Sequence, residues 1–340
     1  MDLVGWICTY TPEEIIRAAG FLPYRLLPYN PEDSAGDRDL LPPALCPYVR
    51  QAARSICRRS NENLRGLVIA NSCSAAIHLY NTFAGRDELF VHLLDLPRLQ
   101  TAEAVEFFTA QLTKMAFVLG REGQEVTLDR LRQAVEYCRE TEKLYSGHRE
   151  NSLVFQGEGL SQFFELVLEG SSGRRYEFNL NIERLSKRTG VTPPYLVLTG
   201  ALPPRGLVEL LAESNLPCHL DNCLASRYIF RCYPPGLDKA STREELLQVI
   251  AGSYLDKPPC PRVNSRLRQE SYRRQFTAGK VRGVIYHDLS FCDLSHYDSL
   301  ILAEECASFN IPLLKINTEL GLTDAGQIQT RIQAFLEMLG

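Results

Sequence analysis

The stretch RGLVIANSC, residues 65–73, is an apolar run that ends in polar residues and a cysteine. A short apolar run of this kind is typical of a buried strand in a parallel sheet. A related stretch, RGVIYHDLSFC at residues 282–292, repeats the pattern in the second half of the chain. In each half a Cys-Pro pair, Cys46-Pro47 or Cys260-Pro261, precedes a predicted helix that leads to this strand. The repeated pattern predicts two similar α/β units.

Apolar runs alternate with helical patterns along most of the chain. Strands are predicted at residues 3–8, 22–27, 66–71, 89–94, 195–198, 218–221, 281–286 and 312–316. Two long helical patterns between residues 101 and 147 predict a helical hairpin. We therefore expect an α/β fold of two doubly wound, Rossmann-like domains with a helical insertion. The expected division is an N-terminal α/β domain with the hairpin over 1–150, a helical linker region over 151–190, and a C-terminal α/β domain over 191–340.

The composition is that of an ordinary globular protein. Of the 340 residues, 45% are hydrophobic and 23% are charged, which argues against disorder. The 37 basic and 41 acidic residues are nearly balanced, so no nucleic-acid partner is expected. No apolar run reaches the ~18 residues that a membrane span needs, and residues 1–6 lack the features of a secretory signal. We expect a cytoplasmic protein that does not bind membranes.

Eleven cysteines are the unusual feature of this composition. Thiols stay reduced in the cytoplasm, where they serve as core residues, nucleophiles or metal ligands. Cys46 and Cys260 lie where a helix is expected to begin, and the helix dipole favours a thiolate there. Other cysteines follow predicted strands, at the sheet edge where open α/β folds bind ligands. Six cysteines occupy such positions: Cys8, Cys46, Cys73, Cys223, Cys260 and Cys292.

The spacing of these six thiols bears on which metal they would bind. Structural zinc favours two closely spaced Cys-x2–4-Cys pairs. Only one pair here reaches that spacing, Cys218 and Cys223, with four residues between them. Iron–sulfur clusters are held by cysteine thiolates and tuned by hydrogen bonds to the sulfurs. We therefore predict an iron–sulfur cluster in the cleft between the two domains. A zinc site and unliganded core cysteines are the alternatives.

The remaining cysteines are expected to have structural roles. Three lie within helical patterns and are predicted to be small core residues: Cys57, Cys138 and Cys306. Cys218 and Cys232 are also expected to be structural, although either could replace Cys8 as the sixth ligand.

The sequence identifies no catalytic residue, and three side chains are candidates. Glu14 lies at a helix start beside Cys8, where its interaction with the helix dipole is a sufficient explanation. His287 and His296 bracket Cys292 and could protonate a reduced substrate, or they could be ordinary structural histidines.

Several motifs, in their order along the chain, resemble the 2-hydroxyacyl-CoA dehydratase family and its relatives, the benzoyl-CoA reductase small subunits and the double-cubane cluster proteins. The matching stretches are CTYTPEE at 8–14, AAGFLP at 18–23, Cys46-Pro47, NSC at 71–73, DNC at 221–223 with Arg227, FCD at 291–293, and GQIQTR at 326–331 with Ala334-Phe335. The resemblance covers nearly the whole chain.

The resemblance implies a particular set of cluster ligands. In the dehydratases one [4Fe-4S] cluster per subunit is held by three cysteines, which correspond to Cys46, Cys73 and Cys292. The chain also has Cys8, Cys223 and Cys260 in similar positions, which makes it more similar to the double-cubane proteins. In that branch six cysteines of one chain hold two [4Fe-4S] units joined by a bridging sulfide, an [8Fe-9S]-type cluster.

The resemblance also implies partners and an activity. It points to a separate ATP-dependent iron–sulfur activator as electron donor, and the chain lacks the Gly-x4-Gly-Lys-Ser/Thr loop with which a P-loop protein binds ATP. We therefore expect an iron–sulfur oxidoreductase that binds no ATP, forms a homodimer and reduces a small molecule. The first alternative is a 2-hydroxyacyl-CoA dehydratase subunit, a lyase, with a single [4Fe-4S] cluster in a heterodimer. The second is a non-catalytic electron carrier or a zinc-stabilised scaffold.

Overall fold

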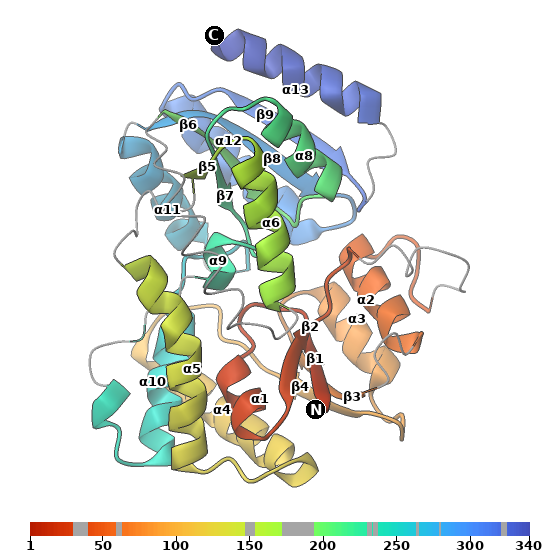
Figure 1. Ribbon diagram of the computed structural model, residues 1–340, viewed down its shortest axis with the longest axis vertical. Coiled ribbons are helices and arrows are strands. Elements are labelled where there is room, and N and C mark those ends of the chain that lie inside the picture. Colours follow the sequence, from red (N-terminus) through yellow and green to blue (C-terminus); the bar gives the residue numbers. More distant parts are fainter. Residues whose placement is uncertain are drawn as a thin grey trace. The chain divides into compact units, whose positions relative to one another are not determined.

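The structure is a computed structural model that describes residues 1–29, 40–58, 63–146, 154–171, 194–229, 233, 237–262, 265–278, 280–320 and 325–340 (Figure 1). The chain divides into two compact units, each built around its own sheet. Unit 1 comprises Met1–Gly147, Gly170–Arg175 and Ile229–Lys257, and unit 2 comprises His148–Glu169, Tyr176–Tyr228 and Pro258–Gly340.

Unit 1 contains a four-stranded parallel sheet with the order β2-β1-β3-β4. Its strands are β1 (Leu3–Trp6), β2 (Leu22–Arg25), β3 (Leu64–Ala70) and β4 (Phe90–Leu94). The connecting helices are α1 (Glu13–Ala18), α2 (Pro47–Cys57) and α3 (Ser74–Phe83). Since the chain leaves β1 toward β2 on one side and continues at β3 on the other, the order of the strands reverses between β1 and β3. In open α/β sheets this switch point is where ligands bind.

Three helices complete unit 1. The predicted helical hairpin is confirmed as α4 (Ala102–Glu122) and α5 (Leu128–Ser146). Helix α10 (Arg243–Leu255) packs against both, although it lies far away in the sequence. Its Thr242 and Glu245 form a capping box, which satisfies free N–H groups of the first turn. Unit 1 also contains the short 3-10 helix η2 (Leu237–Lys239). The structure thus differs from the continuous domains expected from the sequence, because Ile229–Lys257 belongs to the first unit.

Unit 2 contains a five-stranded sheet with the order β5-β7-β6-β8-β9. Its strands are β5 (Val154–Phe155), β6 (Tyr195–Gly200), β7 (Cys218–Asp221), β8 (Val281–Leu289) and β9 (Leu313–Thr318). All neighbours are parallel except β5, which pairs antiparallel with β7 at the edge. The order β7-β6-β8-β9 reproduces the order of unit 1, with the switch point between β6 and β8. Strand β5 lies in the range expected to be a helical linker region, and that expectation did not include a strand.

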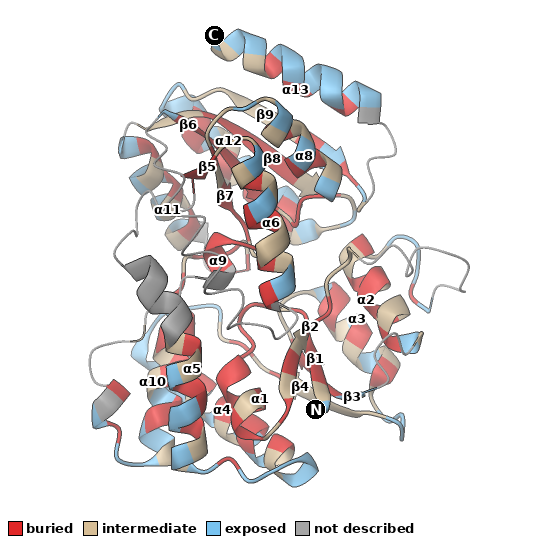
Figure 2. Ribbon diagram, viewed as in Figure 1, coloured by how far each residue is buried: buried red, intermediate tan, exposed pale blue. Residues whose placement is uncertain are grey.

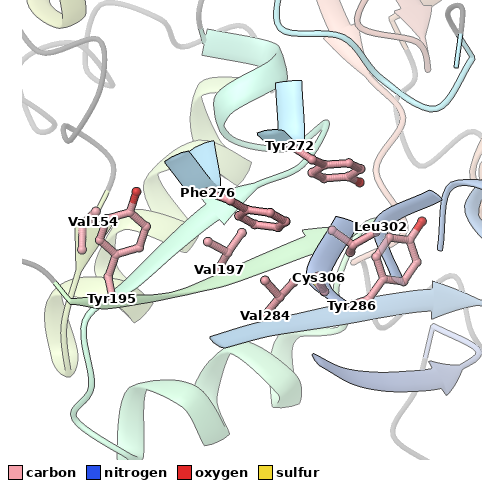
Figure 3. Packing of buried hydrophobic residues seen from close by; sticks show 9 residues of the cluster. All are labelled: Val154, Tyr195, Val197, Tyr272, Phe276, Val284, Tyr286, Leu302 and Cys306. Carbon is pink, nitrogen blue, oxygen red and sulfur yellow. The ribbon is translucent and has the colours of Figure 1, made fainter. Parts of the chain in front are cut away.

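The described helices of unit 2 are α6 (Glu158–Ser171), α8 (Arg205–Glu213), α9 (Ser226–Ile229), α11 (Ser265–Thr277), α12 (Asp293–Ser308) and α13 (Ala325–Leu339). The last residues of α6 and α9 fall within the ranges of unit 1. Side chains from β5, β6, β8, α11 and α12 form one buried cluster (Figure 3). Strand β6 is buried along its whole length, as Figure 2 shows. Such continuous burial is typical of a parallel strand that is covered on both faces.

The predicted α/β class with two parallel-sheet units is confirmed. In the described part of the chain, every helix is too short or too polar to cross a lipid bilayer.

Candidate functional site

Three of the six predicted ligands cap helices. Cys46, Cys73 and Cys292 are the N-cap residues of α2, α3 and α12. The carbonyl of each accepts the first N–H bond of its helix, from Arg50, Ile77 and His296 respectively, at 3.0–3.3 Å. None of the three side chains accepts a capping hydrogen bond from its helix. At these positions the positive end of the helix dipole favours a negatively charged sulfur.

In unit 1 two of the cysteines flank the switch point of the sheet. Cys8 follows the end of β1 at Trp6, and Cys73 follows the end of β3 at Ala70. These strands are hydrogen-bonded neighbours and run parallel, so their carboxyl ends lie at the same edge.

Tyr48 connects the third cysteine of unit 1 to this edge. Its hydroxyl donates a hydrogen bond to the carbonyl of Ile7 at 3.1 Å. Burial raises the pKa of Tyr48; Arg25 opposes this increase, and Cys8 and Cys46 add to it. Because Tyr48 interacts with both sulfurs, Cys46 lies near the carboxyl end of β1 together with Cys8.

In unit 2 the cysteines follow a different pair of strands than in unit 1. Cys292 follows β8 at the switch point and thus corresponds to Cys73, whereas Cys223 follows β7, the strand that corresponds to β2. Phe291, directly before Cys292, is 54% exposed and has a φ of 60°. An aromatic residue rarely adopts this left-handed conformation, and such strain clusters at functional sites.

The prediction that Cys260 also begins a helix is wrong. Helix α11 begins at Ser265, and the residues directly after Cys260 form a turn. The preceding carbonyl, that of Pro259, accepts a hydrogen bond from Arg268 Nη1 at 3.1 Å. A side chain of α11 therefore holds this segment, which is buried at Cys260.

A buried ionic network lies beneath the carboxyl edge of the second sheet. Asp221, the last residue of β7, pairs with Arg227 Nη2 at 2.9 Å and lies 3.6 Å from Arg268 Nη2. Burial by itself would raise the pKa of Asp221, but the two guanidinium groups hold it well below its usual value. Arg268 also pairs with Asp298 of α12 at 2.9 Å. The Asp221–Arg227 pair is thus accompanied by a second buried pair, so the formal charges of the network cancel.

Glu14 is a fully buried carboxylate of unit 1. It accepts hydrogen bonds from the hydroxyls of Tyr233 and of Tyr254, the latter at 2.8 Å. The same Tyr254 hydroxyl accepts a bond from the backbone N–H of Glu13 at 3.3 Å. These bonds attach α10 to the start of α1. The placement of Glu14 therefore matches a structural role in which the carboxylate is satisfied by neighbouring hydroxyls.

The two candidate histidines lie in opposite environments. His287 is fully buried on β8, with Nε2 2.9 Å from the hydroxyl of Thr318. Burial lowers its pKa to about 4, so the ring is neutral at neutral pH. The side chain of His296 is 68% exposed and lies 3.4 Å from Asp288. Of the two, His296 is the histidine whose ring is exposed to solvent.

The cysteines that were assigned structural roles divide into buried and exposed residues. Cys138 and Cys306 are buried, as predicted, whereas Cys57 at the end of α2 is exposed, which corrects the expectation that it is a core residue. Cys218 is buried at the amino end of β7, away from the carboxyl edge, and burial raises the pKa of its thiol to about 12. Cys232 lies outside the described residues.

The donor set has the chemistry of an iron–sulfur site. It consists of thiols, three of them at helix N-termini, and unit 2 adds a buried guanidinium next to Cys223. No disulfide joins the described cysteines. In the described ranges no three histidine, cysteine or acidic side chains are gathered closely enough to hold a metal ion.

Several residues of the site were not predicted from the sequence. Arg268, Tyr272 and Asp298 form the second half of the ionic network, and Tyr286 donates to Asp298 at 3.1 Å. A signal was present, since Arg268 shares a helix face with the buried residues Tyr272 and Phe276 at intervals of four. A charged residue on the buried face of a helix indicates a buried partner.

Comparison with known proteins gives a consistent result. The sequence model of the family "2-hydroxyglutaryl-CoA dehydratase, D-component" matches residues 8–339. The chain is 21% identical to the (R)-phenyllactyl-CoA dehydratase beta subunit of Clostridium sporogenes, over 99% of this chain and 91% of that subunit. It is also 21% identical to subunit beta of the (R)-2-hydroxyglutaryl-CoA dehydratase of Acidaminococcus fermentans, over 99% of this chain and 92% of that subunit. The chain therefore belongs to the 2-hydroxyglutaryl-CoA dehydratase D-component family.

Proposed function

We propose that the chain is an iron–sulfur oxidoreductase whose cysteines hold a double-cubane [8Fe-9S]-type cluster. In this proposal it receives low-potential electrons from a separate ATP-dependent activator and reduces a small molecule. The six ligands are Cys8, Cys46, Cys73, Cys223, Cys260 and Cys292.

One observation supports this proposal: each unit contains three of the six cysteines, and all of them except Cys260 follow a strand end or begin a helix. In unit 1, Cys8 and Cys73 follow neighbouring parallel strands, and Tyr48 interacts with Cys8 and Cys46. In unit 2 the segment before Cys260 contacts Arg268, whose network also includes the residues around Cys223. Three thiolates from each unit match the number that two linked clusters require. The position of Cys218 at the opposite end of β7 supports Cys8 as the sixth ligand.

The chain's own residues contribute an electrostatic environment. When bound, such a cluster supplies one-electron transfer at low potential. The N-termini of α2, α3 and α12 favour the charged form of Cys46, Cys73 and Cys292. A reducing cytoplasm would keep these thiols available as ligands.

Metal and acid-labile sulfide analysis of anaerobically purified protein tests the proposal. We expect about eight iron atoms per chain from the composition of a double cubane. Cys260→Ser should lose half of the iron or the whole cluster, whereas Cys57→Ser, at an exposed position outside the ligand set, should retain all of it. Unchanged iron in Cys260→Ser would contradict the six-ligand assignment.

A second candidate is a 2-hydroxyacyl-CoA dehydratase subunit with a single [4Fe-4S] cluster. This function uses Cys46, Cys73 and Cys292 as ligands. It is favoured because these three cysteines are N-cap residues and the other three are not. The two relatives named above are dehydratase beta subunits, which also points this way. About four iron atoms per chain, retained in Cys260→Ser but lost in Cys292→Ser, would favour this function.

The oligomeric state separates the candidates further. The double-cubane proposal includes a homodimer, and the dehydratase alternative includes a different partner subunit. Light scattering of the purified chain and co-purification from the native cell distinguish the two. Zinc without sulfide would contradict both and favour the zinc-stabilised scaffold.

A further inference from the structure

The loop that carries Cys223 closes on itself through backbone and side-chain hydrogen bonds. The N–H of Arg227 donates to the carbonyl of Asn222 at 3.0 Å, so Cys223 lies inside a hydrogen-bonded turn. Asn222 Oδ1 accepts bonds from the N–H groups of Leu224 and Ala225 at 2.9 and 3.1 Å. This geometry holds Cys223 and the first atoms of Arg227 in one small loop.

Arg227 uses only part of its guanidinium within the protein. Nη2 donates to Thr199 Oγ1, to the carbonyl of Asp221 and to its carboxylate, at 2.9–3.1 Å. The side chain is 1% exposed, yet Nε and Nη1 are buried and no described residue offers them a hydrogen-bond acceptor. Asn222 Nδ2, at the other end of the turn, is also buried without one.

Buried N–H groups without an acceptor are costly. Each one costs about 1–3 kcal/mol, and more for a charged group. They are therefore expected where an acceptor arrives with a ligand. Arg227 interacts electrostatically with Cys223, the half-buried residue between the two groups of unused donors. Sulfur atoms of a metal centre at Cys223 would supply the missing acceptors.

We propose that Arg227 is a positioning residue that donates its Nε and Nη1 hydrogen bonds to the sulfur of Cys223 and to the iron–sulfur centre bound there. This inference rests on the proposed function, because it requires Cys223 to be a ligand. Positive charge and N–H donors near the sulfurs favour the reduced, more negative state of a cluster. Arg227 thus raises the reduction potential of the centre.

The experiment is an anaerobic redox titration of the iron-loaded full-length protein, monitored by electron paramagnetic resonance. Arg227→Gln removes the charge and the donor fork, and Arg227→Lys keeps the charge but removes the fork. We expect the midpoint potential to become more negative in both, with a roughly tenfold change in the reduction equilibrium of Arg227→Gln, which is about 59 mV for one electron.

Ser226→Ala is the matched control. It removes the 2.9 Å bond from Ser226 to Asp221 in the same buried loop but leaves the donors of Arg227 in place. We expect an unchanged potential in this variant. The midpoint temperature of thermal unfolding, measured for all three variants, tests whether the protein remains folded.

The outcomes separate the inference from the proposed function. Unchanged iron in Cys223→Ser overturns the assignment of Cys223 as a ligand, and with it the premise. If Cys223→Ser loses iron but both Arg227 variants keep the wild-type potential, the inference is overturned and the proposed function stands. An equal shift in Ser226→Ala overturns it as well. A shift confined to the Arg227 variants supports it.

Discussion

The substitution Asp298→Ala tests the buried network of unit 2 most directly. The carboxylate is 1% exposed and accepts four hydrogen bonds. Arg268 donates at 2.9 and 3.4 Å, Tyr272 at 2.7 Å and Tyr286 at 3.1 Å. Truncation to alanine removes both acceptor oxygens, and with them all four bonds, and leaves the Arg268 guanidinium buried.

The expected loss of stability follows from the partners that remain. Arg268 then has Asp221 as its nearest carboxylate, at 3.6 Å. Tyr286 keeps the carbonyl of Ser295 as an acceptor at 2.7 Å. Removing one partner of a buried ion pair costs about 3–5 kcal/mol, because the other charge stays buried. We expect Asp298→Ala to lower the free energy of unfolding of unit 2 by this amount.

Urea unfolding monitored by circular dichroism measures this loss. The control is Glu165→Ala, since the Glu165 and Arg205 side chains form a pair that is 46% and 43% exposed. Exposed pairs contribute about 0–1 kcal/mol, so the control should change the unfolding midpoint little. Equal shifts for the two variants would refute the assignment of a large stabilising energy to the network.

Two further predictions concern a buried histidine and a crowded glycine. Because burial lowers the folded-state pKa of His287 to about 4, the unfolded chain binds a proton first and stability falls as the pH drops from about 6.5 to 4, by up to about 3 kcal/mol. His287→Asn should flatten this pH dependence of stability. The part due to His92 remains, because burial also lowers the pKa of His92 to about 4. His296→Asn, at an exposed position, should leave the dependence unchanged, and equal pH profiles of the two variants would count against the assignment. Gly200→Ala should destabilise the second sheet, since φ is +99° and a Cβ would lie 2.3 Å from the carbonyl of His287. Gly85→Ala is the control, because φ is +80° there but no atom lies close to the position of a Cβ. A comparable loss of stability in both variants, measured by thermal unfolding, would mean that backbone strain and not the clash is responsible.

Much of the fold was accessible from local patterns. The strand predicted at 218–221 is observed as β7 (Cys218–Asp221), and the predicted hairpin appears as α4 and α5. The positions of Cys73 and Cys292 also followed from local order, because each ends an apolar run and begins a helix. These features depend on periodicity and on residues that are neighbours in the chain.

Other features depend on contacts between distant segments. Strand β5 has two residues and exists because it pairs with β7. Helix α10 belongs to unit 1 because its Tyr254 bonds to Glu14, 240 residues away in the sequence. The difference between Cys46 and Cys260 likewise came from Arg268, which holds the carbonyl before Cys260.

The amino-acid order alone was sufficient to identify two α/β halves and the cysteines at strand ends, since hydrophobic period, proline and helix starts are properties of short stretches. The ionic network of Arg268 and Asp298, the unused donors of Arg227 and the exposure of Cys57 emerged from the folded chain. Burial and pairing are properties of a three-dimensional neighbourhood, and no short stretch contains the residues that compose it.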